Sequence, residues 1–301
     1  MGYSVFSVQV MLSVPRAGAS PDGRAAAVVT ELVCYPVKGC AGVSMTETLL
    51  TESGLAHDRT FMVVGDNGVF RSQRRDPRLA AISPEVSADG DRLTLRLPGF
   101  DALTVQVDLL SARREVELFG TPYQGIDQGR AAAEWLSEVL GAPSRLVRVP
   151  PEHRRVTDGW IPGTSGYADS SPVHLVSEAT LALLNRRLTE GGGVPLPMAR
   201  FRPNVVIGGG TRPHWEDGAR RMLVGDTELG YAKLAIRCAV TMVDQDSGTR
   251  AGPEPLRTLA TYRRAPEGGV AFGVKLSVVR PGKLALGDEV NVTSWGEPEL
   301  R

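Results

Sequence analysis

Short runs in which apolar and polar residues alternate occupy most of the chain, and turn sequences separate them. The pattern predicts strands over residues 28–36, 60–64, 91–97, 103–107, 114–118 and 145–149 in the first half. In the second half it predicts strands just before residue 177 and over residues 204–207, 222–224, 233–242, 270–279 and 289–292. Sequences such as Asp66-Asn67-Gly68 have the composition of the turns that join strands.

Two segments show the spacing of amphipathic helices instead. Residues 129–140 carry apolar side chains at helical intervals, and Gly141 ends the segment. Residues 177–180 have the chemistry of a helix start, and the glycines at 191–193 end the second helix. Many short strands with two main helices predict a β-rich α+β protein with barrel-like sheets.

Proline and glycine content divides the chain into regions. Residues 15–24 are rich in glycine, proline and alanine, so we expect a disordered extension over residues 1–26. The polar stretch over residues 150–166 indicates a boundary. We therefore expect a β-rich N-terminal region over residues 27–148 and a second domain over residues 149–301, and the first strand, within residues 27–60, could pack with the second domain.

Composition excludes several classes of protein. The 301 residues include 34 basic and 34 acidic side chains, so the basic excess expected of a nucleic-acid-binding protein is missing. No apolar run approaches the ~20 residues that span a bilayer. The three cysteines are too few and too scattered for a disulfide scaffold, a zinc site or an iron–sulfur cluster. We expect a cytoplasmic protein with no membrane span and no nucleic-acid partner.

Six polar clusters follow one another along the chain. They are Tyr35-Pro36-Val37-Lys38-Gly39-Cys40, Gly54-Leu55-Ala56-His57-Asp58-Arg59, Tyr167-Ala168-Asp169-Ser170-Ser171-Pro172, Phe201-Arg202-Pro203-Asn204, Arg237-Cys238 with Val243-Asp244-Gln245-Asp246-Ser247-Gly248, and Pro281-Gly282-Lys283 with Gly287-Asp288. Each cluster alone has little specificity. Their order resembles the MOSC family over about residues 27–292, and within it the amidoxime-reducing components and their bacterial relatives. The resemblance implies a MOSC N-terminal β-barrel region followed by a MOSC domain.

The resemblance also implies a molybdenum cofactor, in which a pterin dithiolene holds the metal and a protein cysteine adds a further sulfur ligand. That cysteine corresponds to Cys238. An isolated cysteine is more often a small core residue, so the assignment depends on the family. A thiolate suits molybdenum, and the neighbouring cation Arg237 favours the thiolate, although alternation in a strand would direct the two side chains to opposite faces. Cys34 and Cys40 are expected to be buried, inert thiols.

Cations scattered through the chain would otherwise be taken for surface charges. The pterin carries a phosphate, and arginine can hold a phosphate with two parallel hydrogen bonds. The positions that match the family imply a cofactor site made of Lys38, Gly39, Arg59, Ser170, Ser171, Arg202, Asn204, Arg237 and Lys275. Asn204 offers both a donor and an acceptor to a pterin edge, or simply begins a strand.

Asp169 lies in a sequence that has the composition of a plain turn, which the resemblance makes a loop lining the cofactor. We expect Asp169 near the metal, as the catalytic proton source for N–O cleavage. The Asp244-x-Asp246-x-Gly248 pattern lacks the further ligands of a calcium loop and predicts a tight turn. Lys275 stands where relatives have a tyrosine, and Gly39 where some have a serine, so substrate preference stays open.

The sequence therefore predicts a molybdenum-dependent oxidoreductase that reduces N-hydroxylated small molecules. Electrons are expected from a separate ferredoxin, flavoprotein or cytochrome, because no ferredoxin-like domain is present in this chain. The alternative is a binding protein that carries the cofactor or handles sulfur without reductase turnover. The lack of a pyridoxal-phosphate desulfurase domain weakens the sulfur version. A family member that has lost the cofactor is the third alternative.

Overall fold

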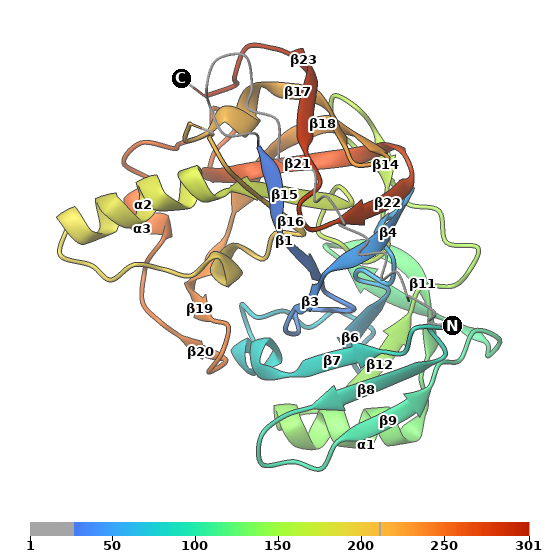
Figure 1. Ribbon diagram of the computed structural model, residues 1–301. Helices are drawn as coiled ribbons and strands as arrows, with labels where there is room; N and C mark the ends of the chain where they lie inside the picture. The colour runs from blue at the N-terminus through green and yellow to red at the C-terminus, as the bar shows by residue number, and fades with distance from the viewer. Residues whose placement is uncertain (1–26, 211, 301) are drawn as a thin grey trace, which may run out of the picture.

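Short strands joined by turns make up most of the computed structural model, which describes residues 27–210 and 212–300 (Figure 1). The first half contains β1 (Val28–Cys34), β2 (Val37–Lys38), β3 (Val43–Met45), β4 (Glu47–Thr51), β5 (Gly54–Leu55), β6 (Phe61–Gly65), β7 (Ser83–Val86), β8 (Arg92–Arg96), β9 (Leu103–Gln106), β10 (Arg113–Leu118), β11 (Thr121–Asp127), α1 (Arg130–Leu140) and β12 (Ser144–Arg148). The second half contains β13 (Val156–Thr157), β14 (Gly163–Thr164), β15 (Val173–Ser177), α2 (Glu178–Glu190), β16 (Val205–Gly208), β17 (Ala219–Val224), β18 (Thr227–Arg237), β19 (Val243–Asp244), β20 (Thr249–Arg250), α3 (Leu256–Leu259), β21 (Val270–Arg280), β22 (Gly282–Ala285) and β23 (Val290–Trp295). The β-rich α+β class with two main helices is confirmed, and the expected extension over residues 1–26 lies outside the described residues.

An eight-stranded sheet forms the upper part of the molecule in Figure 1, in the order β23-β17-β18-β21-β15-β16-β1-β3. Its two ends approach each other, because Val290 N donates to Ala27 O at 2.8 Å and Val29 N donates to Asp288 O at 2.9 Å. These bonds curl the sheet, which gives it the expected barrel-like character. The N-terminal strand β1 thus pairs with β16, although the two strands are more than 160 residues apart.

Apolar side chains are buried on both faces of this sheet. Leu175 and Leu276 belong to the core enclosed by the curled sheet, whereas Val176 and Phe272 point to the opposite face. Helices α2 and α3 cover that second face (Figure 1), with Leu184 as one of the packing residues. The near-continuous apolar runs of β15 and β16 follow from burial on both sides.

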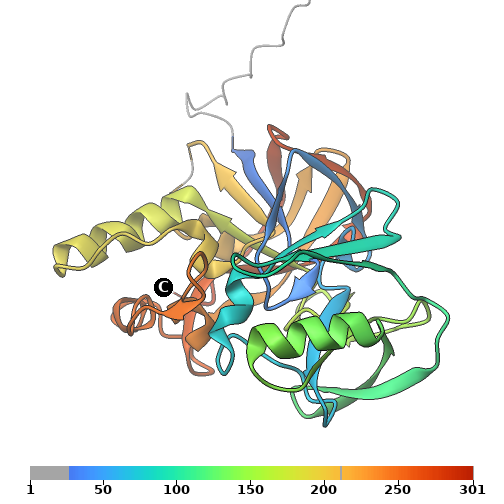
Figure 2. The ribbon, with the colours of Figure 1, turned by 90° about the horizontal axis from the view of Figure 1, so that it is seen from below.

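A five-stranded sheet in the order β10-β11-β12-β6-β2 forms the lower part, with the three-stranded sheet β7-β8-β9 beside it. Helix α1 packs on β12 and lies across this part of the molecule in the view from below (Figure 2). Strand β2 runs parallel to β6 and pairs Lys38 with Met62. This pairing directs the chain after β1 from the upper sheet into the lower one.

Two differences from the sequence-based expectations have clear physical causes. The strand expected over residues 233–242 ends at Arg237, because Thr241 N and Oγ1 both donate to Cys238 O, at 3.0 and 2.9 Å, and form a 3-10 turn. Strand β11 was not expected, since Pro122 and Gly125 are residues that strands disfavour. A Cβ at Gly125 would lie 3.0 Å from the Tyr167 hydroxyl, so a larger residue there would displace its neighbours.

None of the helices in residues 27–210 and 212–300 has the length and apolar character needed to cross a membrane.

A prediction concerns the stacked pair Phe201 and Phe272, whose ring centroids lie 3.7 Å apart at 22°. Both side chains are fully buried. We expect Phe272→Ala to lower the free energy of unfolding by about 3–5 kcal/mol, because it leaves a cavity in the core. Urea unfolding measures the change. Leu110→Ala, at a side chain that is 92% exposed, is the control and should change the value by less than about 0.5 kcal/mol. A similar value for both variants would contradict the packing described here.

Candidate functional site

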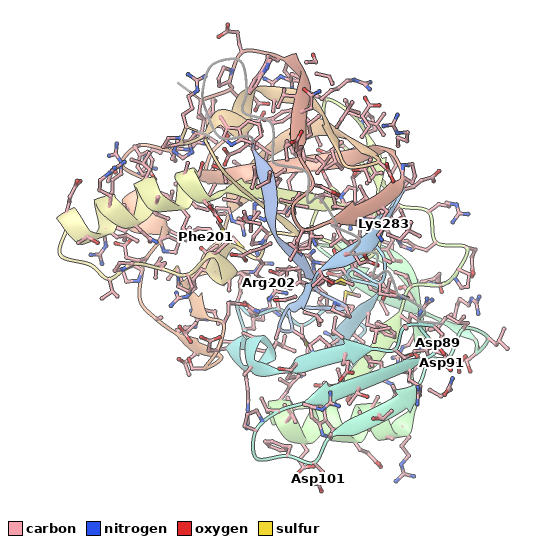
Figure 3. All side chains as sticks on the ribbon, in the orientation of Figure 1. Asp89, Asp91, Asp101, Phe201, Arg202 and Lys283 are labelled. Carbon is pink, nitrogen blue, oxygen red and sulfur yellow. The ribbon has the colours of Figure 1, made fainter. Side chains whose placement is uncertain are left out.

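A cavity of about 360 Å³ lies where the upper and lower parts of the molecule meet. Every residue expected at the cofactor site lines it: Lys38, Gly39, Arg59, Asp169, Ser170, Ser171, Arg202, Asn204, Arg237, Cys238 and Lys275. Figure 3 labels Arg202 near the centre of the molecule, with Phe201 beside it. The tertiary structure therefore brings together residues from segments far apart in the sequence.

Cys238 directly follows β18 and is partly exposed to the cavity. Because the strand ends at Arg237, strand alternation does not separate the two side chains, and both line the cavity. Arg237 donates from Nη2 to Phe201 O at 2.9 Å. The other two thiols, Cys34 and Cys40, are buried as expected, and burial raises the pKa of both, to about 12 for Cys40.

Two of the cationic residues have unusual backbone conformations. Arg59 and Arg202 have φ angles of 48° and 55°, in the left-handed region that residues other than glycine rarely adopt. Their guanidinium groups lie 4.3 and 4.2 Å from the centroid of the Tyr35 ring. Such conformations persist only where the surroundings enforce them, and they cluster at functional sites.

The buried carboxylate of Asp58 holds this arrangement in place. It accepts hydrogen bonds from Tyr35 N at 2.8 Å and Asn204 Nδ2 at 3.0 Å, and it pairs with Arg59 Nη1 at 2.5 Å. The Asn204 oxygen accepts from Arg59 Nη1 at 3.0 Å and from His174 N at 3.2 Å. Because both ends of its amide are occupied by protein groups, Asn204 is placed to position Arg59 and does not present a free edge to a pterin.

Lys38 and Asp169 form an ion pair at the cavity. Desolvation alone would raise the pKa of Asp169. The charge and the hydrogen bond of Lys38, followed by the charge of Lys275, outweigh desolvation and hold this pKa well below its usual range. Desolvation in turn lowers the pKa of Lys38, which the pairing with Asp169 partly offsets. A carboxylate held ionised by this pairing has no proton of its own to donate, and the role expected for Asp169 from sequence stays a prediction.

Lys275 faces the same cavity without such a partner. Burial, and then the charges of Arg237 and Arg59, lower the pKa of Lys275 to about 7. Burial also lowers the pKa of Arg202 and of Arg237. Within residues 27–210 and 212–300, these three cations form no salt bridge. The cavity therefore holds an excess of positive charge that the protein itself does not neutralise.

Buried polar atoms without hydrogen-bond partners also indicate that the cavity is suited to an anion. Ser171 Oγ and Arg237 Nε are buried and have no hydrogen-bond partner among the described residues. An anionic group with several acceptor oxygens would satisfy these donors and the free cations. The described segments contain no group of three His, Cys, Asp or Glu side chains that could hold a metal ion unaided. The unpartnered donors and cations thus fit an anionic ligand, and the partly exposed Cys238 thiol lines the same cavity.

Several residues in or near the cavity were not anticipated from sequence. His174 is buried, and its Nε2 lies 3.2 Å from Phe272 O. Gly273 beside it has a φ of 74°, and a Cβ there would lie 2.5 Å from Leu175 O, so only glycine fits. Arg155 donates to Gly166 O and Ala168 O, which fixes the loop before Asp169. These residues acquire a role only through the residues that surround them in the folded protein. No local sequence pattern marked them.

Comparisons with known proteins identify the family of the chain. The MOSC N-terminal beta barrel domain matches residues 26–143, and the MOSC domain matches residues 162–291. The chain is 34% identical over 284 residues to mitochondrial amidoxime reducing component 2 of Rattus norvegicus and 34% identical over 282 residues to component 1 of Homo sapiens; each alignment covers 87% of this chain and 82% of the relative. A molybdenum cofactor sulfurase of Danio rerio is 33% identical over 291 residues, which cover 88% of this chain and 34% of the sulfurase.

Among solved structures, the YUAD protein from Bacillus subtilis is similar with a TM-score of 0.38 and 12% identity, covering 89% of this chain and 95% of that chain. A Bordetella bronchiseptica protein has a TM-score of 0.28 and 25% identity, over 34% of this chain and 86% of its own. The family matches cover most of the chain, and the relatives at 34% identity are aligned over most of their own length. The chain belongs to the MOSC family, with a MOSC N-terminal beta barrel domain followed by a MOSC domain.

Proposed function

We propose that this protein binds a molybdenum cofactor and reduces N-hydroxylated small molecules by cleaving their N–O bond. The observation that carries the proposal is the partly exposed Cys238 thiol in a cavity that also holds the unpaired cations Arg202, Arg237 and Lys275. The names of the amidoxime-reducing relatives support the reaction class.

Each part of the cavity has its own task in this proposal. Cys238 supplies the protein ligand to molybdenum, and the bound cofactor supplies two-electron chemistry. Arg59, Arg202 and Arg237 hold the phosphate, with Lys38, Lys275, Gly39 and the loop Ser170–Ser171 completing the surround. Packing on the Tyr35 ring holds the guanidinium groups of Arg59 and Arg202 in place before the cofactor arrives.

The overall reaction needs an external source of electrons. An amidoxime, two electrons and two protons give an amidine and water, so the N–O bond breaks and the oxygen leaves as water. A separate ferredoxin, flavoprotein or cytochrome would deliver the electrons. Asp169 in this scheme orients Lys38 through their ion pair and does not itself donate a proton.

A second candidate follows from the similarity to the sulfurase. Because that relative is matched over only 34% of its length, the shared part could bind the cofactor or carry sulfur on Cys238 without reducing a substrate. The two candidates make the same prediction for cofactor binding and opposite predictions for turnover.

Ligation of molybdenum by Cys238 can be tested by metal analysis. We expect purified wild-type protein to contain close to one molybdenum per chain and Cys238→Ser to contain far less, since a hydroxyl is a poor substitute for a soft thiolate. Elemental analysis measures the content. Cys34→Ala, which removes a buried thiol away from the cavity, is the matched control and should retain the metal. Equal molybdenum in wild type and Cys238→Ser would refute ligation by Cys238.

The reductase and carrier candidates are separated by turnover with the loaded protein. Wild type is supplied with benzamidoxime or hydroxylamine and a dithionite-reduced dye, which replaces the unknown electron donor. We expect oxidation of the dye with both substrates. Full molybdenum content without any dye oxidation would favour the carrier.

The role of Asp169 can be tested with Asp169→Asn. Loss of a general acid costs roughly 10²–10⁴-fold in rate. We expect kcat for benzamidoxime to fall by less than about tenfold and to keep its pH dependence, because the ionised carboxylate orients Lys38 and does not donate the proton. A loss of a hundredfold or more, with the alkaline limb of the pH profile removed, would restore the proton-source role.

The unpaired cation Lys275 should make the cofactor-free protein less stable. Its pKa is about 7 in the folded chain and 10.5 as a free side chain, so the folded state binds fewer protons between these pH values. Its destabilising effect is therefore full below pH 7 and is lost as pH rises toward 10.5. We expect Lys275→Met to raise the free energy of unfolding by about 1 kcal/mol at pH 6, after allowance for solvent screening, and by less at pH 9.

Urea unfolding at the two pH values, at low salt, measures this effect. Lys233→Met is the matched control, since Lys233 lines the same cavity but pairs with Asp158 at 2.6 Å. It should not stabilise the protein. If the increase in the free energy of unfolding caused by Lys275→Met becomes larger at higher pH, the buried charge of Lys275 is not the cause of the destabilisation.

A further inference from the structure

Two phenylalanine rings that line the cavity take no part in the cofactor site described above. Phe70 follows β6, and Phe119 lies in the turn between β10 and β11. Their ring centroids are 4.7 Å apart at an interplanar angle of 62°, an edge-to-face pair. Phe119 is 44% exposed, so a large part of its ring is available at the cavity.

The backbone at Phe119 shows that this ring is displayed against local preference. Leu118 pairs with Thr121, which leaves a two-residue hairpin loop with φ angles of 55° at Phe119 and 78° at Gly120. A loop with two positive φ angles strongly favours Asn-Gly. Glycine occupies its usual place, but phenylalanine stands where asparagine is favoured. Phenylalanine is thus unfavourable for this turn, and its side chain is not fully buried. Together these two facts indicate that the ring makes a contact beyond the turn itself.

The rest of the cavity wall defines the chemistry of that contact. Leu234, Ile236 and Val240 line the same cavity, and Ile236 is 45% exposed. Acidic groups are present as well: the Asp169 side chain is 61% exposed, and Glu267 is also part of the lining. A ligand with a flat apolar ring and a head of N–H donors matches this combination of surfaces.

Lys38 shows that the two rings lie next to the cofactor site. Lys38 Nζ lies 5.6 Å from the Phe70 centroid and 5.1 Å from the Phe119 centroid, while it pairs with Asp169. A ring packed on this pair would therefore lie beside the residues that surround the cofactor. The rings could instead only shield Lys38 from water, and the experiment below separates these two roles.

We propose that Phe70 and Phe119 form an aromatic binding face that selects N-hydroxylated substrates attached to an aromatic ring over small ones such as hydroxylamine. The inference rests on the proposed function and specifies its substrate class. Asp169 and Glu267 would accept hydrogen bonds from the nitrogen head group of such a substrate.

The test uses Phe119→Asn in the full-length, cofactor-loaded protein. Asparagine removes the ring and suits the turn, so we expect an unchanged or higher melting temperature. kcat/KM for benzamidoxime should fall about three- to tenfold, in line with the loss of one aromatic contact, and kcat/KM for hydroxylamine should stay within about twofold. Phe100→Leu, at a ring that contacts Trp135 outside this cavity, is the matched control and should alter neither substrate.

A fall of the same size for both substrates would overturn the inference, because it would mean that the rings shield Lys38 or the cofactor. No change for either substrate would overturn it too. If wild type reduces neither substrate, the proposed function fails, and calorimetric binding of benzamidine to wild type and Phe119→Asn decides the inference separately. Weaker binding to the variant supports the aromatic face, whereas equal or undetectable binding to both overturns it.

Discussion

The buried carboxylate of Asp58 is the interaction on which the site depends. It ties Tyr35 at the end of β1, Arg59 before β6 and Asn204 before β16 into one network, with contacts of 2.5–3.0 Å. Those three residues connect the upper sheet to the lower one. Loss of this single anion would leave Arg59 charged and buried without a carboxylate partner, which is costly in a protein interior. The Asp58 carboxylate therefore stabilises both the contact between the sheets and the arrangement of the site.

Charge balance explains the rest of the cavity. Asp58 neutralises Arg59 and Asp169 neutralises Lys38, but Arg202, Arg237 and Lys275 have no carboxylate partner within the described segments. Convergent cations repel one another, and burial lowers the pKa of each of the three. Folding must supply the free energy that keeps them together. An anionic cofactor would recover that free energy on binding, which couples occupancy to stability.

The position of the cavity between the two sheets gives its two sides different chemistry. The upper sheet contributes Cys238 and most of the unpaired cations, whereas the lower part contributes Lys38 and the rings Phe70 and Phe119. Lys275 on β21 adds a positive charge to the side of the cavity that the upper sheet forms.

Sequence by itself determined the β-rich class, the two helices and the membership of Lys38, Arg59, Asp169, Arg202 and Cys238 in one family pattern, because periodicity and ordered motifs are local information. Sequence also indicated that Cys34 and Cys40 are structural. Only the tertiary structure decided how these groups act. The early end of β18 places Arg237 and Cys238 in the same cavity. Asp58 and Arg59 occupy both ends of the Asn204 amide, and the ion pair with Lys38 lowers the pKa of Asp169. Hydrogen-bond partners and desolvation depend on neighbours more than a hundred residues away, and no local pattern encodes them.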